Sequence, residues 1–151
     1  QAVIQSELVV PGLDGRKMSK SYGNVIPLFG TAKELKKAVM SIVTGSESLE
    51  EPKNPDGTAI FDLYGLVAGE AKAAELAVKL RAGNYGWGHA KQDLLGALES
   101  ELGPARERYL KLRGDEAGLA QILDHGAERA RTIARATMER VRDKTGIALK
   151  R

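Results

Sequence analysis

Two lysines three residues apart are the strongest candidates for chemistry in this sequence. They belong to the run Lys17-Met18-Ser19-Lys20-Ser21, and glycines stand on both sides of it, at positions 12, 15 and 23. Ammonium groups supply positive charge, hydroxyls and loop amides supply hydrogen-bond donors, and glycines let the segment move. Such a set suits a polyphosphate, because charge develops on its leaving group during reaction. A Lys-x-x-Lys pair by itself, however, is more typical of a solvated loop.

The formal net charge of +3 is concentrated at the two ends of the chain. Residues 1–40 carry six Lys and Arg against three Asp and Glu, residues 41–123 carry nine against thirteen, and residues 124–151 carry eight against four. Basic segments attract phosphate-bearing partners, although a row of arginines on a helix is more often a solvated face. Arg131 and Arg135 would share a helix face, as would Arg135 and Arg142. That face could follow a phosphate backbone.

The elements that must position these residues are nearly all helical. Thr31 and Glu34 fit a capping box, which predicts a helix from there to about Thr44. Apolar residues at helical spacing predict further helices, over about 58–69, 70–82, 89–112, 119–123 and 127–146. Pro104 is expected to kink or restart its helix, and Gly126 to interrupt another.

Three other segments lack helical periodicity. Residues 8–11 form a β-type run stopped by proline, which predicts a short strand. Residues 45–57 are rich in Ser, Glu and Pro and predict an exposed acidic loop. Residues 83–88 hold three glycines and two aromatics, which predicts a sharp turn with Trp87 anchored in the core. The fold class is therefore mainly α: a helical bundle preceded by a short strand and the lysine loop.

Length and composition agree with a folded chain of about one domain. The 151 residues are 42% hydrophobic and 28% charged, which is ordinary globular usage. No apolar run approaches the roughly 18 residues of a membrane span, and no signal peptide is evident. The absence of cysteine excludes disulfides and thiolate zinc sites, and we expect a cytoplasmic protein.

The lysine run carries a family resemblance. It equals the second hallmark motif of the class I aminoacyl-tRNA synthetases, here called the KMSKS motif. Its surroundings resemble bacterial tryptophanyl-tRNA synthetases, and so do short stretches along almost the whole chain. The matching stretches are 11–28, 35–37, 42–46, 51–53, 86–92, 104–109 and 126–130.

The resemblance implies an ATP-dependent ligase. Such an enzyme joins tryptophan to AMP with loss of pyrophosphate and then transfers it to tRNA(Trp). In this reading Lys20 is the main contact to the leaving pyrophosphate, with Lys17 as its supporting charge. Ser19 and Ser21 donate hydrogen bonds to ATP, and Met18 packs the loop against the catalytic domain. ATP is a substrate that brings Mg²⁺, and the loop offers no metal-ligand set of its own.

The family's first hallmark, a His-Ile-Gly-His-type motif, does not occur in the sequence, and neither do the residues that recognise the indole. His89 and His125 are isolated and match no part of it. The resemblance therefore implies the C-terminal portion of the enzyme, inactive by itself. Residues 1–30 would be the edge of a Rossmann-like catalytic domain, and residues 31–151 a helical domain that meets the anticodon end of the tRNA within a homodimer.

The same resemblance suggests which residues contact tRNA. The candidates are Lys91, Arg131, Arg135 and Arg142, although the arginines could instead pair with acidic neighbours on a wet surface. Tyr85 and Trp87 could stack on an unpaired base, although a core anchor is the more common role of an aromatic beside glycines.

Two alternative functions stay open at this point. A tyrosyl-tRNA synthetase shares the catalytic architecture, and the flanks of the motif favour tryptophan over it. A tRNA-binding module without catalysis is the other alternative, and the intact motif speaks against it.

Overall fold

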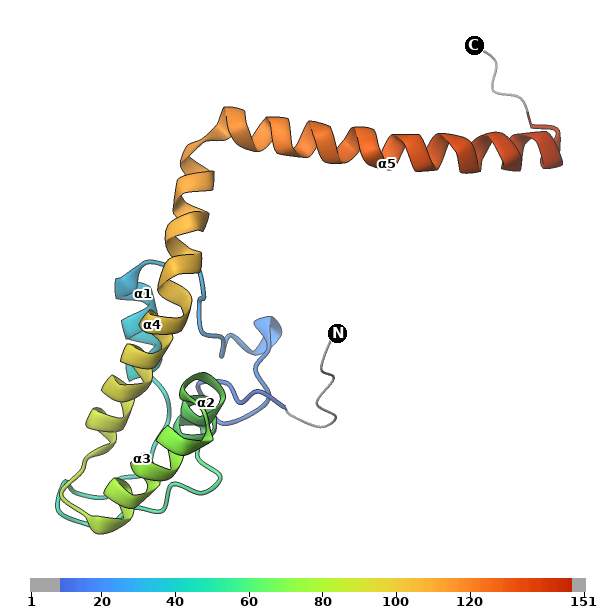
Figure 1. Cartoon of the computed structure of the whole chain (residues 1–151). Helices are drawn as coiled ribbons and strands as arrows, with labels where there is room; N and C mark the ends of the chain where they lie inside the picture. Colours follow the sequence, from blue (N-terminus) through green and yellow to red (C-terminus); the bar gives the residue numbers. More distant parts are fainter. Residues whose placement is uncertain (1–8, 148–151) are drawn as a thin grey trace. The chain divides into compact units, whose positions relative to one another are not determined.

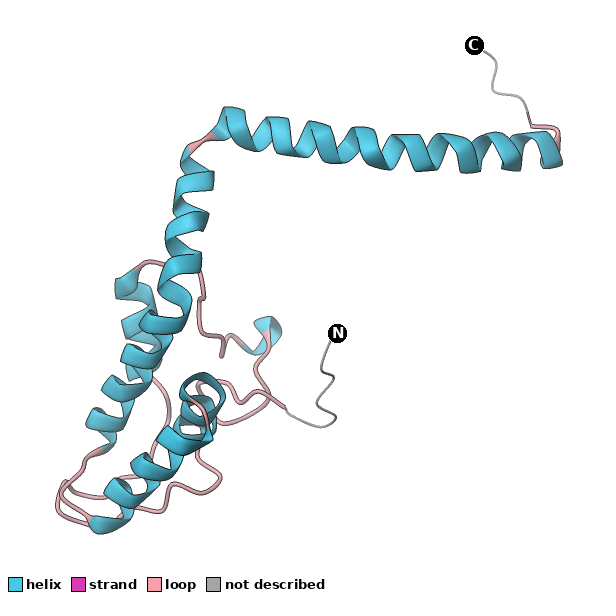
Figure 2. Cartoon of the chain, viewed as in Figure 1, coloured by secondary structure: helices cyan, strands magenta, loops and turns pink. Residues whose placement is uncertain are grey.

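The computed structural model describes residues 9–147 and is mainly helical there (Figures 1 and 2). A short 3-10 helix, η1, spans Lys20–Tyr22. The α-helices are α1 (Ala32–Met40), α2 (Ala59–Ala68), α3 (Glu70–Ala82), α4 (Trp87–Gly114) and α5 (Glu116–Thr145). The prediction of a mainly α fold is confirmed.

The chain divides into two compact units, one up to Arg106 and one from Glu107 onward. The core of the first unit is a single cluster of buried side chains. It draws on α1, α2, α3 and the first half of α4. Leu35, Ile60, Leu80, Ala90 and Leu94 are fully buried in it. Burial of this apolar area holds the four helices together, because each presents one apolar stripe to the same centre.

The predicted capping box is present at the start of α1. The hydroxyl of Thr31 accepts a hydrogen bond from the Glu34 amide at 3.2 Å, and the Glu34 carboxylate accepts one from the Thr31 amide at 2.7 Å. The helix ends at Met40, one turn earlier than the spacing predicts. Ile42 is nevertheless buried beyond its end, whereas Val43, which the spacing predicts on the same apolar stripe, is 65% exposed.

The strand predicted at residues 8–11 is replaced, within the described part, by one antiparallel bridge between Pro11 and Lys17. Residue 8 lies outside the described residues. Pro11 has no amide hydrogen to donate, and the turn formers after it return the chain at once. The ladder therefore stops after one bridge.

The helix break predicted at Gly126 is wrong, because α5 continues through it. Helix α4 continues through Pro104 without a restart. One glycine inside a helix costs only about 1 kcal/mol, so it does not end an element by itself. The break lies at Asp115, whose side chain accepts a hydrogen bond from the Gly118 amide at 2.9 Å and caps α5.

Helix α5 differs from the other four α-helices because none of its residues is buried. The residues predicted to face inward, such as Met138 and Val141, are each 44% exposed. The apolar stripe that the sequence predicts is present, but nothing within the described residues covers it.

Candidate phosphate-binding loop

The KMSKS segment lies in a tight loop whose two arms bond to each other. The Met18 amide donates to the Val10 carbonyl at 2.9 Å, and the Gly12 amide donates to the Arg16 carbonyl at 2.6 Å. The second half of the motif winds into η1, which ends at Gly23 in the left-handed conformation with φ 67°. A glycine suits this position because other residues rarely adopt a positive φ. The loop is thus a defined structure rather than an open chain.

Asn24 ties this loop together from the inside. Its side chain is only 4% exposed and makes three hydrogen bonds. The side-chain oxygen accepts from the Ser19 amide at 2.8 Å, and the side-chain nitrogen donates to the Lys17 carbonyl at 3.1 Å and to the Asp14 carboxylate at 2.7 Å. The sequence interpretation missed this residue.

Asp14 and Arg16 brace Asn24 from the solvent side. The hydrogen bond from Asn24, with those from Arg16, lowers the pKa of Asp14 to about 2. Arg16 forms a salt bridge to Asp14 at 2.6 Å, and its guanidinium lies 4.8 Å from the centre of the Tyr22 ring. The brace therefore joins the first turn of the loop to η1.

Gly12 is required by close packing and not by its backbone angles. A Cβ atom at this position would collide with the side-chain amide of Asn24. The absence of a side chain at Gly12 makes the space that Asn24 occupies.

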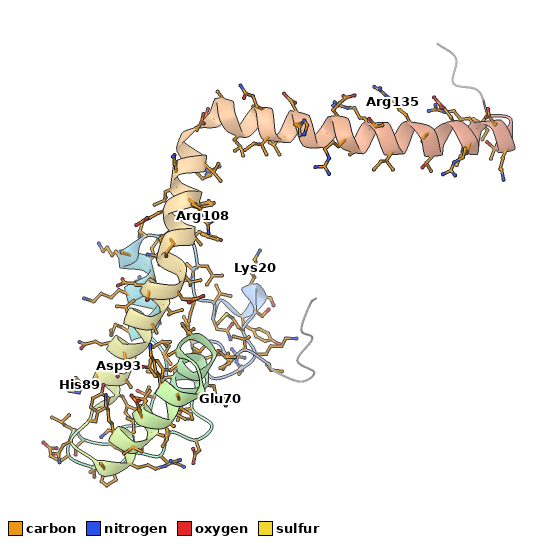
Figure 3. The ribbon with its side chains drawn as sticks, viewed as in Figure 1. Lys20, Glu70, His89, Asp93, Arg108 and Arg135 are labelled. Carbon is orange, nitrogen blue, oxygen red and sulfur yellow. The ribbon has the colours of Figure 1, made fainter. Side chains whose placement is uncertain are left out.

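The structure brings the five predicted ATP-binding residues into this one loop. Lys17 and Lys20 are exposed, and within the described residues neither ammonium has an ion-pair partner. Figure 3 shows the Lys20 side chain extending away from the ribbon. The hydroxyls of Ser19 and Ser21 lie 2.8 Å apart, and Met18 packs against the hydrophobic core of the first unit. The charged groups are free while the backbone that carries them is fixed.

The predicted tRNA-binding residues fall into two different settings. Lys91, on α4, is half-buried, and its ammonium donates to the Met40 carbonyl at 3.1 Å. Burial lowers the pKa of Lys91. Arg131 approaches Glu128 at 3.5 Å, whereas Arg135 has no ion-pair partner among the described residues (Figure 3).

The three arginines Arg131, Arg135 and Arg142 lie on one helix, α5, at spacings of four and seven residues. These spacings put them on one face of it, as predicted. Lys91 belongs to the other unit of the chain.

The core role expected of Trp87 is confirmed. Its ring is 7% exposed, and its indole nitrogen donates to Glu47 at 2.9 Å, which lowers the pKa of that carboxyl. Trp87 therefore does not offer a free ring for stacking.

Tyr85 is half-buried, and its hydroxyl donates to Asp93 at 2.5 Å. Burial, followed by this hydrogen bond, raises the pKa of Tyr85.

A family model described as tRNA synthetases class I (W and Y) matches residues 1–103. The chain belongs to this class I synthetase family. It is 43% identical over 138 residues to a tryptophan–tRNA ligase of Rhodopirellula baltica, covering 91% of this chain and 43% of the relative. A tryptophan–tRNA ligase of Fusobacterium nucleatum is also 43% identical, over 96% of this chain and 44% of the relative.

Solved structures agree with this membership. The crystal structure of the tryptophanyl-tRNA synthetase of Campylobacter jejuni complexed with ADP and tryptophan matches with a TM-score of 0.90 and 40% identity. That match covers 95% of this chain and 45% of the other. The synthetase chain thus spans less than half the length of the relatives it matches. These relatives carry the tryptophan name, so the tyrosyl alternative is not favoured.

A second residue missed by the sequence interpretation organises the acidic segment of this synthetase chain. Lys53 is only 2% exposed, and its ammonium donates to the carbonyls of Ser48 at 2.6 Å, Glu51 at 2.7 Å and Leu49 at 3.2 Å. Most of the segment 45–57 is exposed, as predicted. Lys53 and Pro55 are buried exceptions, and for Lys53 three carbonyls of its own loop replace the water shell of the ammonium.

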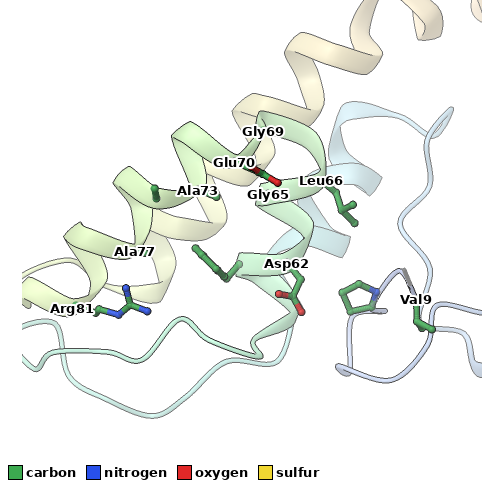
Figure 4. A pocket seen from close by; sticks show the side chains of 12 residues that line it. Val9, Asp62, Gly65, Leu66, Gly69, Glu70, Ala73, Ala77 and Arg81 are labelled. Atoms are coloured by element: carbon green, nitrogen blue, oxygen red, sulfur yellow. The ribbon is translucent and has the colours of Figure 1, made fainter. Parts of the chain in front are cut away.

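The synthetase chain also has a groove of about 920 Å³ along α2 and α3 (Figure 4). Phe61 and Leu66 line it from α2, and Val9 lines it near the start of the loop. None of the predicted site residues lines the groove. Burial raises the pKa of Asp62, which also faces it.

Residues 9–147 lack two further kinds of feature. Helices long and apolar enough to cross a membrane do not occur there. Clusters of three or more His, Asp or Glu side chains able to hold a metal ion do not occur there either.

Proposed function

We propose that the chain is part of a tryptophanyl-tRNA synthetase that activates tryptophan with ATP and transfers it to tRNA(Trp). The observation that carries this proposal is the pair of free ammonium groups on a loop whose backbone is fixed from inside by Asn24. The identity of 43% to tryptophan–tRNA ligases supports the choice of amino acid. Because the chain spans less than half of those relatives, we assign the activity to a longer protein.

In the proposed reaction the tryptophan carboxylate attacks the α-phosphate of Mg²⁺-bound ATP. The bond to the β-phosphate breaks, and pyrophosphate leaves with the electron pair. Lys20 would stabilise the charge that develops on it, and Lys17 would add a second positive charge. Ser19 and Ser21 would donate hydrogen bonds, while Met18 holds the loop to the protein. The Mg²⁺ ion enters with the nucleotide.

We further propose that the helical part, residues 31–151, meets tRNA, and that residues 1–30 belong with a catalytic domain. Arg131, Arg135 and Arg142 would contact phosphates along α5. Lys91 remains a proposed contact, although its ammonium is already bonded to the Met40 carbonyl. The longer enzyme would act as a homodimer in the cytoplasm.

Pyrophosphate exchange on the natural-length protein tests the proposal. Exchange that depends on tryptophan and not on tyrosine is the expected result. Dependence on tyrosine would transfer the function to the tyrosyl enzyme, and no exchange with either would favour a tRNA-binding module. The 151-residue chain alone is the matched control, and we expect no exchange from it.

A further inference from the structure

We infer that Asn24 is the positioning residue of this site: its buried side chain fixes the backbone on both sides of Met18 and thereby sets where Lys17 and Lys20 project. The inference rests on the proposed function, since it concerns how the same loop meets the triphosphate. Asn24 would contact neither substrate.

The side-chain amide of Asn24 forms hydrogen bonds through both its nitrogen and its oxygen. The nitrogen donates to the Lys17 carbonyl at 3.1 Å, and the oxygen accepts from the Ser19 amide at 2.8 Å. These two backbone groups flank Met18, whose side chain packs against the core. A short stretch bonded at both ends and packed at its centre has little freedom left, so the lysines start from defined positions.

The Asp14 carboxylate gives this amide one orientation. A carboxylate accepts hydrogen bonds only, so it selects the nitrogen of Asn24, at 2.7 Å. The oxygen then faces the Ser19 amide, which can only donate. The opposite orientation would put oxygen against oxygen at Asp14 and nitrogen against nitrogen at Ser19. Asp14 is itself held by Arg16 at 2.6 Å, so the brace is complete.

The loop is also joined to the helical body beside Asn24. The Leu13 amide donates to the Asn24 backbone carbonyl at 3.0 Å, and the Leu13 carbonyl accepts from the Val43 amide, beyond the end of α1, at 2.8 Å. Asn24 thus links the lysines to the rigid part of the unit. Two ammonium groups without acidic partners repel each other, and this framework opposes their separation before a triphosphate binds.

The test compares Asn24→Ala with Asn54→Ala in the natural-length enzyme. Asn54 is an exposed asparagine whose side chain, among the residues that the structure describes, bonds the Asp56 amide alone, at 3.1 Å. We expect Asn24→Ala to lower kcat of pyrophosphate exchange about 10- to 100-fold at unchanged tryptophan affinity. Displaced lysine ammonium groups would lose more stabilisation of the transition state than of the ground state. Asn54→Ala should match the unsubstituted enzyme.

Swapping the side chains of Asn24 and Asp14 distinguishes a positioning role of Asn24 from a role in stability alone. Asn24→Asp loses both donated bonds and sets a carboxylate against Asp14, so its kcat should fall at least as far. Adding Asp14→Asn restores an N–H to O bond with reversed direction, and kcat should recover several-fold. A residue needed only for folding would show no such recovery in enzyme that is already folded.

Hydrogen exchange in the 151-residue chain measures the same lock without catalysis. The Ser19 amide should exchange slowly, and at least 10-fold faster in Asn24→Ala. Fast exchange in the variant together with full kcat would overturn the inference and leave the proposed function intact. Absence of pyrophosphate exchange in the unsubstituted enzyme would instead overturn the proposed function. If Asn24→Ala does not fold, Asp14→Ala, which removes the acceptor that orients the Asn24 amide, should lower kcat several-fold, and full kcat there would overturn the inference.

Discussion

The KMSKS loop and helix α5 both carry basic residues predicted to meet phosphates, yet they are built in opposite ways. In the loop, Asn24 is 4% exposed and bonds the backbone on either side of Met18. In α5 no residue is buried, and Arg131 approaches Glu128 at 3.5 Å. One region fixes the backbone and leaves the charges free, whereas the other offers charges on an uncovered helix.

This difference follows from what each region would have to do. Stabilising a leaving group needs a charge within about 0.5 Å of its productive position. Following a nucleic-acid backbone needs charge along a face, and flexible arginines can adjust to it. We therefore expect substitutions in the loop to change a rate and substitutions in α5 to change a salt dependence.

The largest effect is expected for Lys20→Ala in the natural-length enzyme. The rate of tryptophan activation should fall about 100- to 1,000-fold, because a charge aimed at the leaving group is lost. The dissociation constant for tryptophan should stay within about twofold. Single-turnover kinetics with fluorescence titration measure both. A large rise in that constant at an unchanged rate would contradict the assignment.

Lys53→Met should lower the free energy of unfolding of the 151-residue chain by about 3 kcal/mol, because three carbonyls lose a charged donor. Urea unfolding measures this free energy, with the exposed Lys72→Met as control, expected within about 0.5 kcal/mol of the unsubstituted chain.

Ile133→Ala in α5 should also change the free energy of unfolding by no more than about 0.5 kcal/mol, since Ile133 is 73% exposed. A large loss at Ile133 would break the comparison and indicate that a second copy covers α5.

Replacing Arg131, Arg135 and Arg142 by alanine should weaken tRNA binding by the natural-length protein and flatten its salt dependence. The slope of log affinity against log salt should decrease by about 1 for each phosphate that the variant no longer neutralises. Arg81→Ala is the control, because Arg81 already pairs with Asp56 at 2.7 Å in the first unit. An unchanged slope would mean that α5 meets no phosphates.

The smallest effect concerns Asp14 and pH. Its pKa of about 2 in the folded chain lies below the ordinary value of 3.8. The stabilisation from its ionised form is therefore full above about pH 4 and is lost as the pH falls through about 2. An NMR titration of the Asp14 carboxyl should give a midpoint near 2, and Asn24→Ala should raise it. An equal midpoint in both would remove Asn24 as the main cause.

Local signals in the sequence predicted much of the helical fold. The pair Thr31 and Glu34 marks the start of α1, and the glycines at 83 and 86 mark the turn before α4, whereas Gly88 already lies inside that helix. Helix ends that depend on competition between local preferences were harder to predict. Gly126 looks like a break but costs too little to be one, while Asp115 caps α5 with a side chain whose role depends on backbone geometry.

The candidate site was predicted only as far as local sequence reaches. Lys17 to Ser21 form one motif, and the structure keeps them in one loop; their roles in binding ATP stay predictions. Asn24 was missed because its partner Asp14 is ten residues away, and a pairing at that distance has no periodic signal. Lys53 was missed because a lysine in a polar segment is almost always solvated.

The close approach of Gly12 to Asn24 has a consequence for the descent of this loop. A side chain at position 12 would collide with the Asn24 amide and would also lie 2.8 Å from the Asn24 backbone carbonyl oxygen, which every residue at position 24 would carry. Among related sequences the dependence should therefore run one way: position 12 should stay glycine even in a lineage that replaces the asparagine and holds its lysines by other bonds.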